Sequence, residues 1–341
     1  MKIIKLLSVW FFISSWSVAS QAATSIKIAE LNWAGSTASA YVMKAVLEEY
    51  LDADVEIVGG DEIALFEAMA KGDGSIDVFS DFWSIYLPAQ WDRYVKKGSE
   101  ESVKVNAGPY LGTEGLFVPS YVQETLGLTR IEQLADPEIA KQFDTDGDGK
   151  GEYWTGAAGW QSVDENAVKA KSMGYADHWT ASTVETWVME ALLDAAYKRK
   201  KPVLFYHYTP EWIHAAYDLK RLEEPPFTGF ANESFKGDPQ YNPDGCYNFI
   251  QQSEDADWFE NSSITCEKAK TDVYVAYSST LQERAPKIAQ FLDQISFSLG
   301  DMSGWMGRIS NDKEDASVVA KEWLEANRSI IENEWLAGIQ R

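Results

Sequence analysis

Short apolar runs alternate along the chain with segments whose apolar residues recur at helical spacing. Runs at 25–31, 55–58 and 76–79 predict strands, and the segments that follow them predict helices. Another apolar run, at 203–208, ends before Pro210, because proline cannot continue a central strand. This alternation of strands and helices is typical of a parallel sheet. The predicted fold class is therefore α/β.

Aromatic residues stand at or just beyond the ends of several predicted strands. Ligands of open α/β proteins bind beyond the carboxyl ends of the strands, so these rings are candidates for the walls of a pocket. The alternative for any single ring is that it fills the core. The candidates are Trp33, Trp83, Trp160 and Tyr208.

Two predicted helices start beside candidate rings. Ser36, after Gly35, is expected to cap one helix, and Ser162, after Gln161, forms a capping-box pattern with Glu165 at the other. Free N–H groups at a helix start bind anions, including carboxylates. Ring faces attract a methylated onium cation, which has no N–H to donate. Together, the rings and the helix starts predict a ligand of the betaine type.

The first 23 residues have the pattern of an export signal. Lys2 and Lys5 precede an apolar run at 6–13, and small residues then suit cleavage after Ala22 or Ala23. The apolar run is too short to span a bilayer. We expect the signal to be cleaved and the mature protein to lie in the periplasm, with an uncleaved anchor as the alternative.

The composition of the chain limits the kinds of molecule that such an exported protein can bind. The chain has 53 acidic and 30 basic residues, a net charge of −23, which argues against binding to nucleic acid or to an anionic membrane. Its two cysteines, Cys246 and Cys266, are expected to form a disulfide, as an even pair usually does in an exported protein. Closing that loop stabilises the fold by roughly 3 kcal/mol.

One acidic segment matches the first half of a calcium loop. Asp144, Asp146 and Asp148 stand at its first, third and fifth positions, with Gly149 at the sixth and Glu152 at the ninth. The twelfth position lacks the usual glutamate, so a plain turn is the alternative. No cofactor is expected to be required, and calcium would be structural.

Three segments have a specific order and spacing: Asp81-Phe82-Trp83 with Leu87-Pro88, then Phe143 to Lys150 with Gly159-Trp160, then Lys201 to Trp212. Together they resemble the glycine betaine/choline-type substrate-binding proteins of ABC importers, over nearly the whole mature chain. The resemblance implies a two-lobe periplasmic-binding-protein fold of type II. Each lobe would hold a mainly parallel sheet flanked by helices, and two strands would cross between the lobes.

The same resemblance implies a division of the chain and a partner. Lobe 1 would comprise residues 24–114 and 272–341, and lobe 2 residues 115–271. The protein would capture a small onium or betaine solute and deliver it to an ABC permease in the inner membrane. We expect it to act as a monomer.

The resemblance also assigns roles to the candidate rings. Trp83 and Trp160 match tryptophans of an aromatic cage, and Tyr208 stands where many relatives have tryptophan. Trp33 matches an aromatic that only some branches use. Tyrosine keeps a ring face, so the cage is expected to hold a cation.

Other positions depart from the family pattern. Several relatives bind the ligand carboxylate with a histidine where this chain has Glu211 or Leu87. Glu114 stands near a position that is aromatic in choline-binding members, and a buried glutamate there would repel a ligand carboxylate. These departures argue against glycine betaine as the ligand. Choline, carnitine-like compounds and dimethylsulfoniopropionate remain alternative ligands.

Two rival functions also stay open. One is a binding protein for another cationic solute, such as a polyamine, that uses Glu114 and Glu211. The other is a secreted carbohydrate-active enzyme with aromatic platforms and paired carboxylates. The chain has no metal-binding His-Glu-x-x-His, nucleophile elbow, P-loop or dinucleotide fingerprint. No catalytic residue is therefore predicted.

Overall fold

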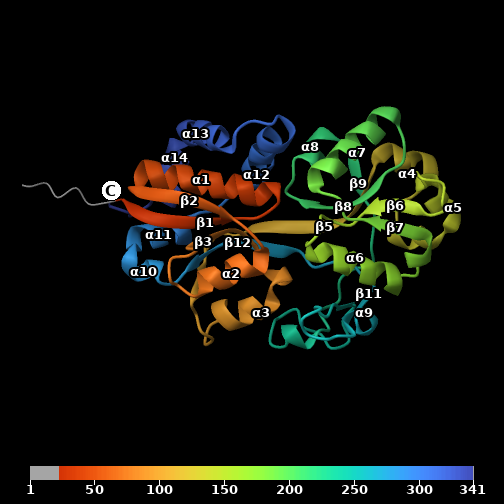
Figure 1. Cartoon of the computed structure of the whole chain (residues 1–341), viewed down its shortest axis with the longest axis horizontal. Coiled ribbons are helices and arrows are strands. Elements are labelled where there is room, and N and C mark those ends of the chain that lie inside the picture. Colours follow the sequence, from red (N-terminus) through yellow and green to blue (C-terminus); the bar gives the residue numbers. More distant parts are fainter. Residues whose placement is uncertain (1–22, 341) are drawn as a thin grey trace, which may run out of the picture.

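The computed structural model describes residues 23–340 as two lobes that lie side by side (Figure 1). The expected export signal, residues 1–23, lies outside the described residues except for Ala23. None of the helices within residues 23–340 has both the length and the apolar character that a bilayer span requires.

The apolar runs near the start of the chain form the central strands of the first lobe. β1 lies between β2 and β3 and is parallel to both, so Ile26 and Ile28 are fully buried. Its strands are β1 (Thr24–Glu30), β2 (Ala53–Gly59), β3 (Val78–Trp83) and β4 (Val103–Val105). Its helices are α1 (Ala34–Tyr50), α2 (Glu62–Ala70), α3 (Pro88–Gln90), α10 (Leu281–Arg284), α11 (Pro286–Gln294), α12 (Leu299–Met306), α13 (Ala316–Ala326) and α14 (Arg328–Ile330).

The second lobe repeats this plan around the predicted strand at 203–208. β6 pairs in parallel with β7 on one side and with β8 on the other. Its strands are β6 (Gly151–Trp154), β7 (Trp179–Ser182), β8 (Leu204–Thr209), β9 (Leu219–Arg221), β10 (Tyr247–Asn248) and β11 (Ser263–Ile264). Its helices are α4 (Ser120–Leu126), α5 (Pro137–Ala140), α6 (Gln161–Ser172), α7 (Thr186–Arg199), α8 (Ile213–Ala216) and α9 (Trp258–Asn261).

Two antiparallel strands connect the lobes. β5 (Tyr110–Pro119) leaves the first lobe and pairs with β8 in the second, and β12 (Thr271–Ser278) returns to pair with β3. β5 and β12 also pair with each other, and both run through the middle of the molecule (Figure 1). The strand order is β2-β1-β3-β12-β5-β8-β6-β7. The ends of β3 and β8 therefore face each other across the junction.

The predicted cap of the first helix is wrong. The N-cap of α1 is Trp33, and Ser36 lies within the first turn. The Ser36 hydroxyl accepts a hydrogen bond from the Leu31 N–H at 2.8 Å and lies 2.7 Å from the Ser80 hydroxyl. Because this hydroxyl joins α1 to the strands beneath it, it is not free to cap the helix.

The capping box predicted for α6 is wrong for a similar reason. The N-cap is Trp160, and the Ser162 hydroxyl donates to the Thr155 carbonyl at 3.1 Å. Glu165 forms an ion pair with Lys268 at 2.6 Å and accepts a hydrogen bond from the Gln161 side chain at 3.0 Å, so it does not bond to the backbone N–H of Ser162. Both predicted box residues are committed to tertiary contacts.

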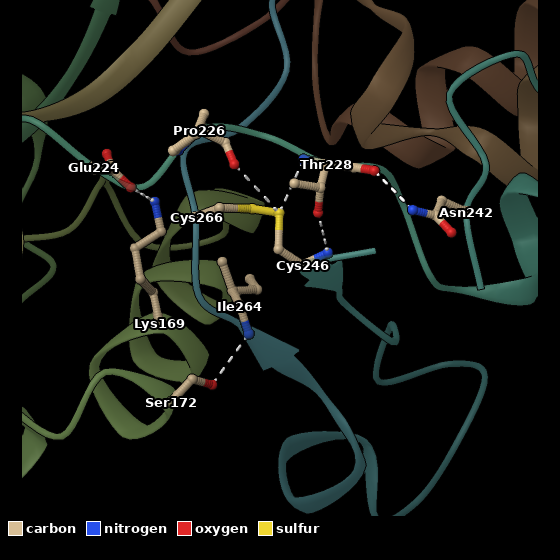
Figure 2. Close-up of a disulfide and its surroundings, with 9 residues drawn as sticks. All are labelled: Lys169, Ser172, Glu224, Pro226, Thr228, Asn242, Cys246, Ile264 and Cys266. Carbon is tan, nitrogen blue, oxygen red and sulfur yellow. Dashed lines mark hydrogen bonds and ion pairs between the residues drawn. A yellow bond between two sulfur atoms is a disulfide. The ribbon is translucent and has the colours of Figure 1, made fainter. Parts of the chain in front are cut away.

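The predicted disulfide is confirmed, and it fastens the irregular excursion that contains β10 and β11. Figure 2 shows Cys246 joined to Cys266, with Thr228 beside them. The Thr228 N–H donates to Cys246 Sγ at 3.2 Å, and the Cys246 N–H donates to Thr228 Oγ1 at 3.1 Å. The Ile264 N–H donates to Ser172 Oγ at 3.1 Å, which attaches the excursion to the end of α6.

Candidate functional site

Aromatic rings from both lobes converge on one cavity at the junction. The space between them is about 450 Å³, part of it open to solvent. The first lobe contributes Trp33, Trp83 and Tyr86, and the second contributes Trp160, Tyr206 and Tyr208. We call these six residues the cage. Glu62, Glu114, Gln161 and Ser162 complete the lining.

Two pairs of cage rings lie edge to face across the junction. Trp83 and Tyr208 have ring centroids 5.5 Å apart at 76°, and Trp33 and Trp160 have centroids 6.2 Å apart at 87°. Each of these pairs takes one ring from each lobe. An onium cation in the cavity that these pairs line would meet several electron-rich faces, each worth roughly 0.5–2 kcal/mol.

Asp81, on β3, orients two of the cage indoles. Trp33 Nε1 donates to Asp81 Oδ2 at 2.6 Å and Trp83 Nε1 donates to the same oxygen at 3.3 Å, while the Tyr110 hydroxyl donates to Oδ1. Burial raises the pKa of Asp81 to about 6, against the opposing effect of these three donors. The indole N–H groups therefore point away from the ligand space, and the ring faces remain available to a ligand.

Glu114 is held in a buried network beneath the cage. The hydroxyls of Tyr86 and Tyr206 both donate to its Oε2, and Lys268 Nζ lies 3.2 Å from its Oε1. Burial alone would raise the pKa of Glu114, but Lys268 and the two tyrosines lower it below its usual value. Lys268 also pairs with Glu165, so its charge is shared between two carboxylates.

Lys268 also contacts an aromatic ring of the cage. Its Nζ lies 3.4 Å from the centroid of the Tyr86 ring and 5.8 Å from that of Tyr247. A lysine held against ring faces is itself a cation–π contact. The floor of the cage is thus built from one ammonium, two carboxylates and several tyrosine rings.

The remaining predicted site residues lie in different places. Gly35 packs against Asp81, since a Cβ on Gly35 would lie 2.9 Å from Asp81 Oδ2. Ser36, in the first turn of α1, is fully buried and does not line the cavity. Glu211 is buried and lines a neighbouring cleft that it shares with Tyr208. Trp33, Trp83, Trp160, Tyr208, Gln161, Ser162 and Glu114 all line the cage cavity.

Five residues of the site were not predicted. Tyr206 precedes Tyr208 by two positions on β8, and residues two apart share a face, so the strand pattern could have found it. Tyr86 follows Trp83 in the same strand-end segment. Glu62, Asp81 and Lys268 carry no comparable local signal. Their place in the site depends on packing between segments far apart in the chain, such as the contacts of Asp81 with Trp33 and Tyr110.

The acidic loop at 144–152 lies away from the cage, ahead of β6. The carboxylates of Asp144, Asp146, Asp148 and Glu152 offer oxygens that all lie within 4.8 Å of one another. Asp144 accepts hydrogen bonds from the N–H groups of Gly147 at 2.6 Å and Gly149 at 2.9 Å. Glu152 Oε1 is buried and, within residues 23–340, has no hydrogen-bond partner.

Comparison with known families agrees with the geometry. A family model described as the substrate-binding domain of an ABC-type glycine betaine transport system matches residues 24–326. The chain belongs to this family. Members of the glycine betaine substrate-binding family are transport binding proteins rather than enzymes.

Curated relatives within the glycine betaine substrate-binding family are similar over part of their length. The glycine betaine/proline betaine-binding periplasmic protein of Escherichia coli (strain K12) is 33% identical over 155 residues, 43% of this chain and 44% of that protein. The glycine betaine-binding periplasmic protein OusX of Dickeya dadantii (strain 3937) is 28% identical over 152 residues, 43% of each chain. The chain thus matches less than half the length of either relative.

Solved structures confirm the predicted type II fold for this member of the family. An ABC-transporter choline-binding protein in complex with choline gives a TM-score of 0.66 at 19% identity, over 92% of each chain. Lactococcal OpuAC, closed on glycine betaine, gives 0.64 at 16% identity, over 92% of this chain and 99% of that one. At such identities the likeness concerns the fold alone.

Proposed function

We propose that the protein captures a small methylated onium solute in the cage and delivers it to an ABC permease in the inner membrane. The observation that carries this proposal is the convergence of six rings, three from each lobe, on one cavity. A ligand that contacts both sets of rings stabilises the closed arrangement of the lobes. Capture by closure is the property that a substrate-binding component needs.

Further parts of the proposal follow from the family and the sequence. The protein is a periplasmic monomer with a cleaved signal, without catalytic residues, and lobe 1 comprises residues 24–114 and 272–341 with lobe 2 between them. Solute binding requires no cofactor. The loop at 144–152 is where a structural calcium ion would bind, since its carboxylate oxygens are gathered and one of them has no partner among residues 23–340.

The network around Glu114 answers the objection that this residue would repel a ligand carboxylate. Lys268 and two tyrosine hydroxyls stabilise its charge. The same pairing weakens the polyamine alternative, because Glu114 is already occupied by an ammonium from the protein. The neighbouring Glu211 lies in another cleft and does not line the cage. Neither of the two glutamates expected to bind a polyamine is therefore free to hold a ligand ammonium in the cage.

The cage is tested by calorimetric titration with glycine betaine, choline and dimethylsulfoniopropionate. We expect at least one of them to bind, and Trp83→Ala to weaken that binding about tenfold or more, because it removes a ring face. Trp83→Phe keeps a smaller ring and should lose less. Trp187→Ala is the matched control, since that side chain is 66% exposed and lies outside the cage.

Two results would contradict the proposal. One is a folded wild-type protein that binds none of the three solutes. The other is a Trp83→Ala variant, folded as judged by circular dichroism, that binds as tightly as wild type.

A further inference from the structure

The carboxylates around the cage differ in whether they have protein partners. Asp81 receives two indole N–H groups and a tyrosine hydroxyl, and Glu114 receives two tyrosine hydroxyls and an ammonium. Glu62 also lines the cavity. Within residues 23–340, no hydrogen bond or ion pair to the Glu62 carboxylate is formed. It is thus the one carboxylate lining the described cavity that remains available to a ligand.

The position of Glu62 explains why its carboxylate is free. It is the first residue of α2, and the N-cap is Asp61, whose Oδ1 accepts a hydrogen bond from the Ala64 N–H at 3.0 Å. Because Asp61 satisfies that amide at the helix start, the Glu62 carboxylate is not needed there. Glu62 is partly buried at the cavity wall.

An uncompensated carboxylate at such a wall is costly to keep charged. Burial, and then the nearby charges of Asp61 and Asp81, raise the pKa of Glu62 to about 7, while Lys268 acts in the opposite direction. A cation in the cage would offset this cost, and a hydroxyl on the ligand would supply the missing hydrogen bond. A carboxylate on the ligand would supply neither a positive charge nor a hydrogen-bond donor, and it would bring a second negative charge into the same cavity.

We propose that Glu62 selects a net cationic onium alcohol of the choline class over a zwitterionic betaine, by accepting a hydrogen bond from the ligand hydroxyl. The inference rests on the proposed function, since it assigns the ligand class of the same cage. Glu62 is then a residue that determines specificity. The cage rings attract every onium solute and do not distinguish between them.

The test is a comparison of choline and glycine betaine by calorimetry, for wild type, Glu62→Gln, Glu62→Asp and the control Glu56→Gln. Glu56 lies on β2 with its side chain 63% exposed, so its substitution changes the net charge equally but away from the cage. We expect wild type and Glu56→Gln to bind choline at least tenfold more tightly than glycine betaine. Glu62→Gln should lose most of that preference, mainly through weaker choline binding, and Glu62→Asp should retain part of it.

A pH series provides a second readout that a purely structural role would not change. Choline affinity of wild type should rise between pH 6 and 8, as Glu62 ionises, and this rise should be absent in Glu62→Gln. Asp61, Asp81 and Lys268 surround Glu62 in both proteins, so any pH dependence that they cause would persist in the variant.

The outcomes separate this inference from the proposed function. Glycine betaine bound as tightly as choline by wild type, or an equal loss for both ligands in Glu62→Gln, would overturn the selection by Glu62 and leave the cage standing. Absence of binding of every onium solute to wild type would overturn both.

Discussion

Burial affects the acidic side chains of this protein differently, because their donors differ. Glu114 has an ammonium and two hydroxyls, and its pKa is lowered. Asp81 has three neutral donors, and its pKa is raised to about 6. Glu211 receives the Ile213 N–H at 3.0 Å, and burial, aided by the charge of Glu190, raises its pKa to about 8. The hydrogen-bond donors and charges around each carboxylate therefore decide whether it is ionised at neutral pH.

Glu211 should make stability depend on pH. Its pKa is about 8 in the folded protein, against an ordinary value of 4.5, so the folded state holds its proton more tightly. The resulting stabilisation is fully present below about pH 4.5 and is lost as the pH rises through about 8. We expect the melting temperature of wild type to fall between pH 5 and 8 more steeply than that of Glu211→Gln.

Differential scanning calorimetry of the two proteins in matched buffers measures this difference. Glu56→Gln serves as the control, and its curve should run parallel to that of wild type. Parallel curves for wild type and Glu211→Gln would show that Glu211 ionises normally in the folded state.

At the scale of elements, the strands were predictable and the starts of two helices were not. Apolar runs locate β1, β2, β3 and β8 because a buried strand needs apolar side chains whatever surrounds it. Caps depend on where a hydroxyl points. Ser36 and Ser162 have cap-like sequence positions, but their hydroxyls bond to other parts of the fold. Local sequence cannot reveal such tertiary partners.

The same limit applies to the cage. The strand-end rings were predictable from their position, because β3 and β8 end at the junction. Lys268 was not, since it lies in an irregular segment and reaches Glu114 and Glu165 only once β5 and α6 are packed together. The aromatic residues of the cage can thus be predicted from their positions at strand ends. The charged residues beneath them can be identified only from the folded structure.

The acidic loop before β6 should respond to calcium. The ion would bind Glu152 Oε1, which has no partner in the part of the chain that the structure describes, and would hold the three aspartates in place. We expect calcium to raise the melting temperature of wild type and not that of Asp146→Ala, with magnesium as the control ion. Equilibrium dialysis gives an independent measure, and equal calcium retention by both proteins would exclude a site here.

At the scale of the whole molecule, the net charge of −23 should affect capture. A strongly negative protein raises the local concentration of a cation, and salt screens this effect over roughly 10 Å at 0.1 M. We expect the association rate of choline to fall about threefold or more between low salt and 0.3 M salt. Stopped-flow measurements with glycine betaine provide the control, since a zwitterion should show little dependence. An equal response of both solutes would argue against long-range attraction.

The two lobes meet through a pair of indoles, and this pair has an optical consequence. Trp33 and Trp160 belong to different lobes, and Trp160 Nε1 donates to Asn32 Oδ1 at 3.0 Å across the junction. When the lobes separate, each indole exchanges an aromatic neighbour and a polar partner for water. The ultraviolet emission of tryptophan responds to such exchanges. The intrinsic tryptophan fluorescence of the protein should therefore report the opening and closing of its lobes.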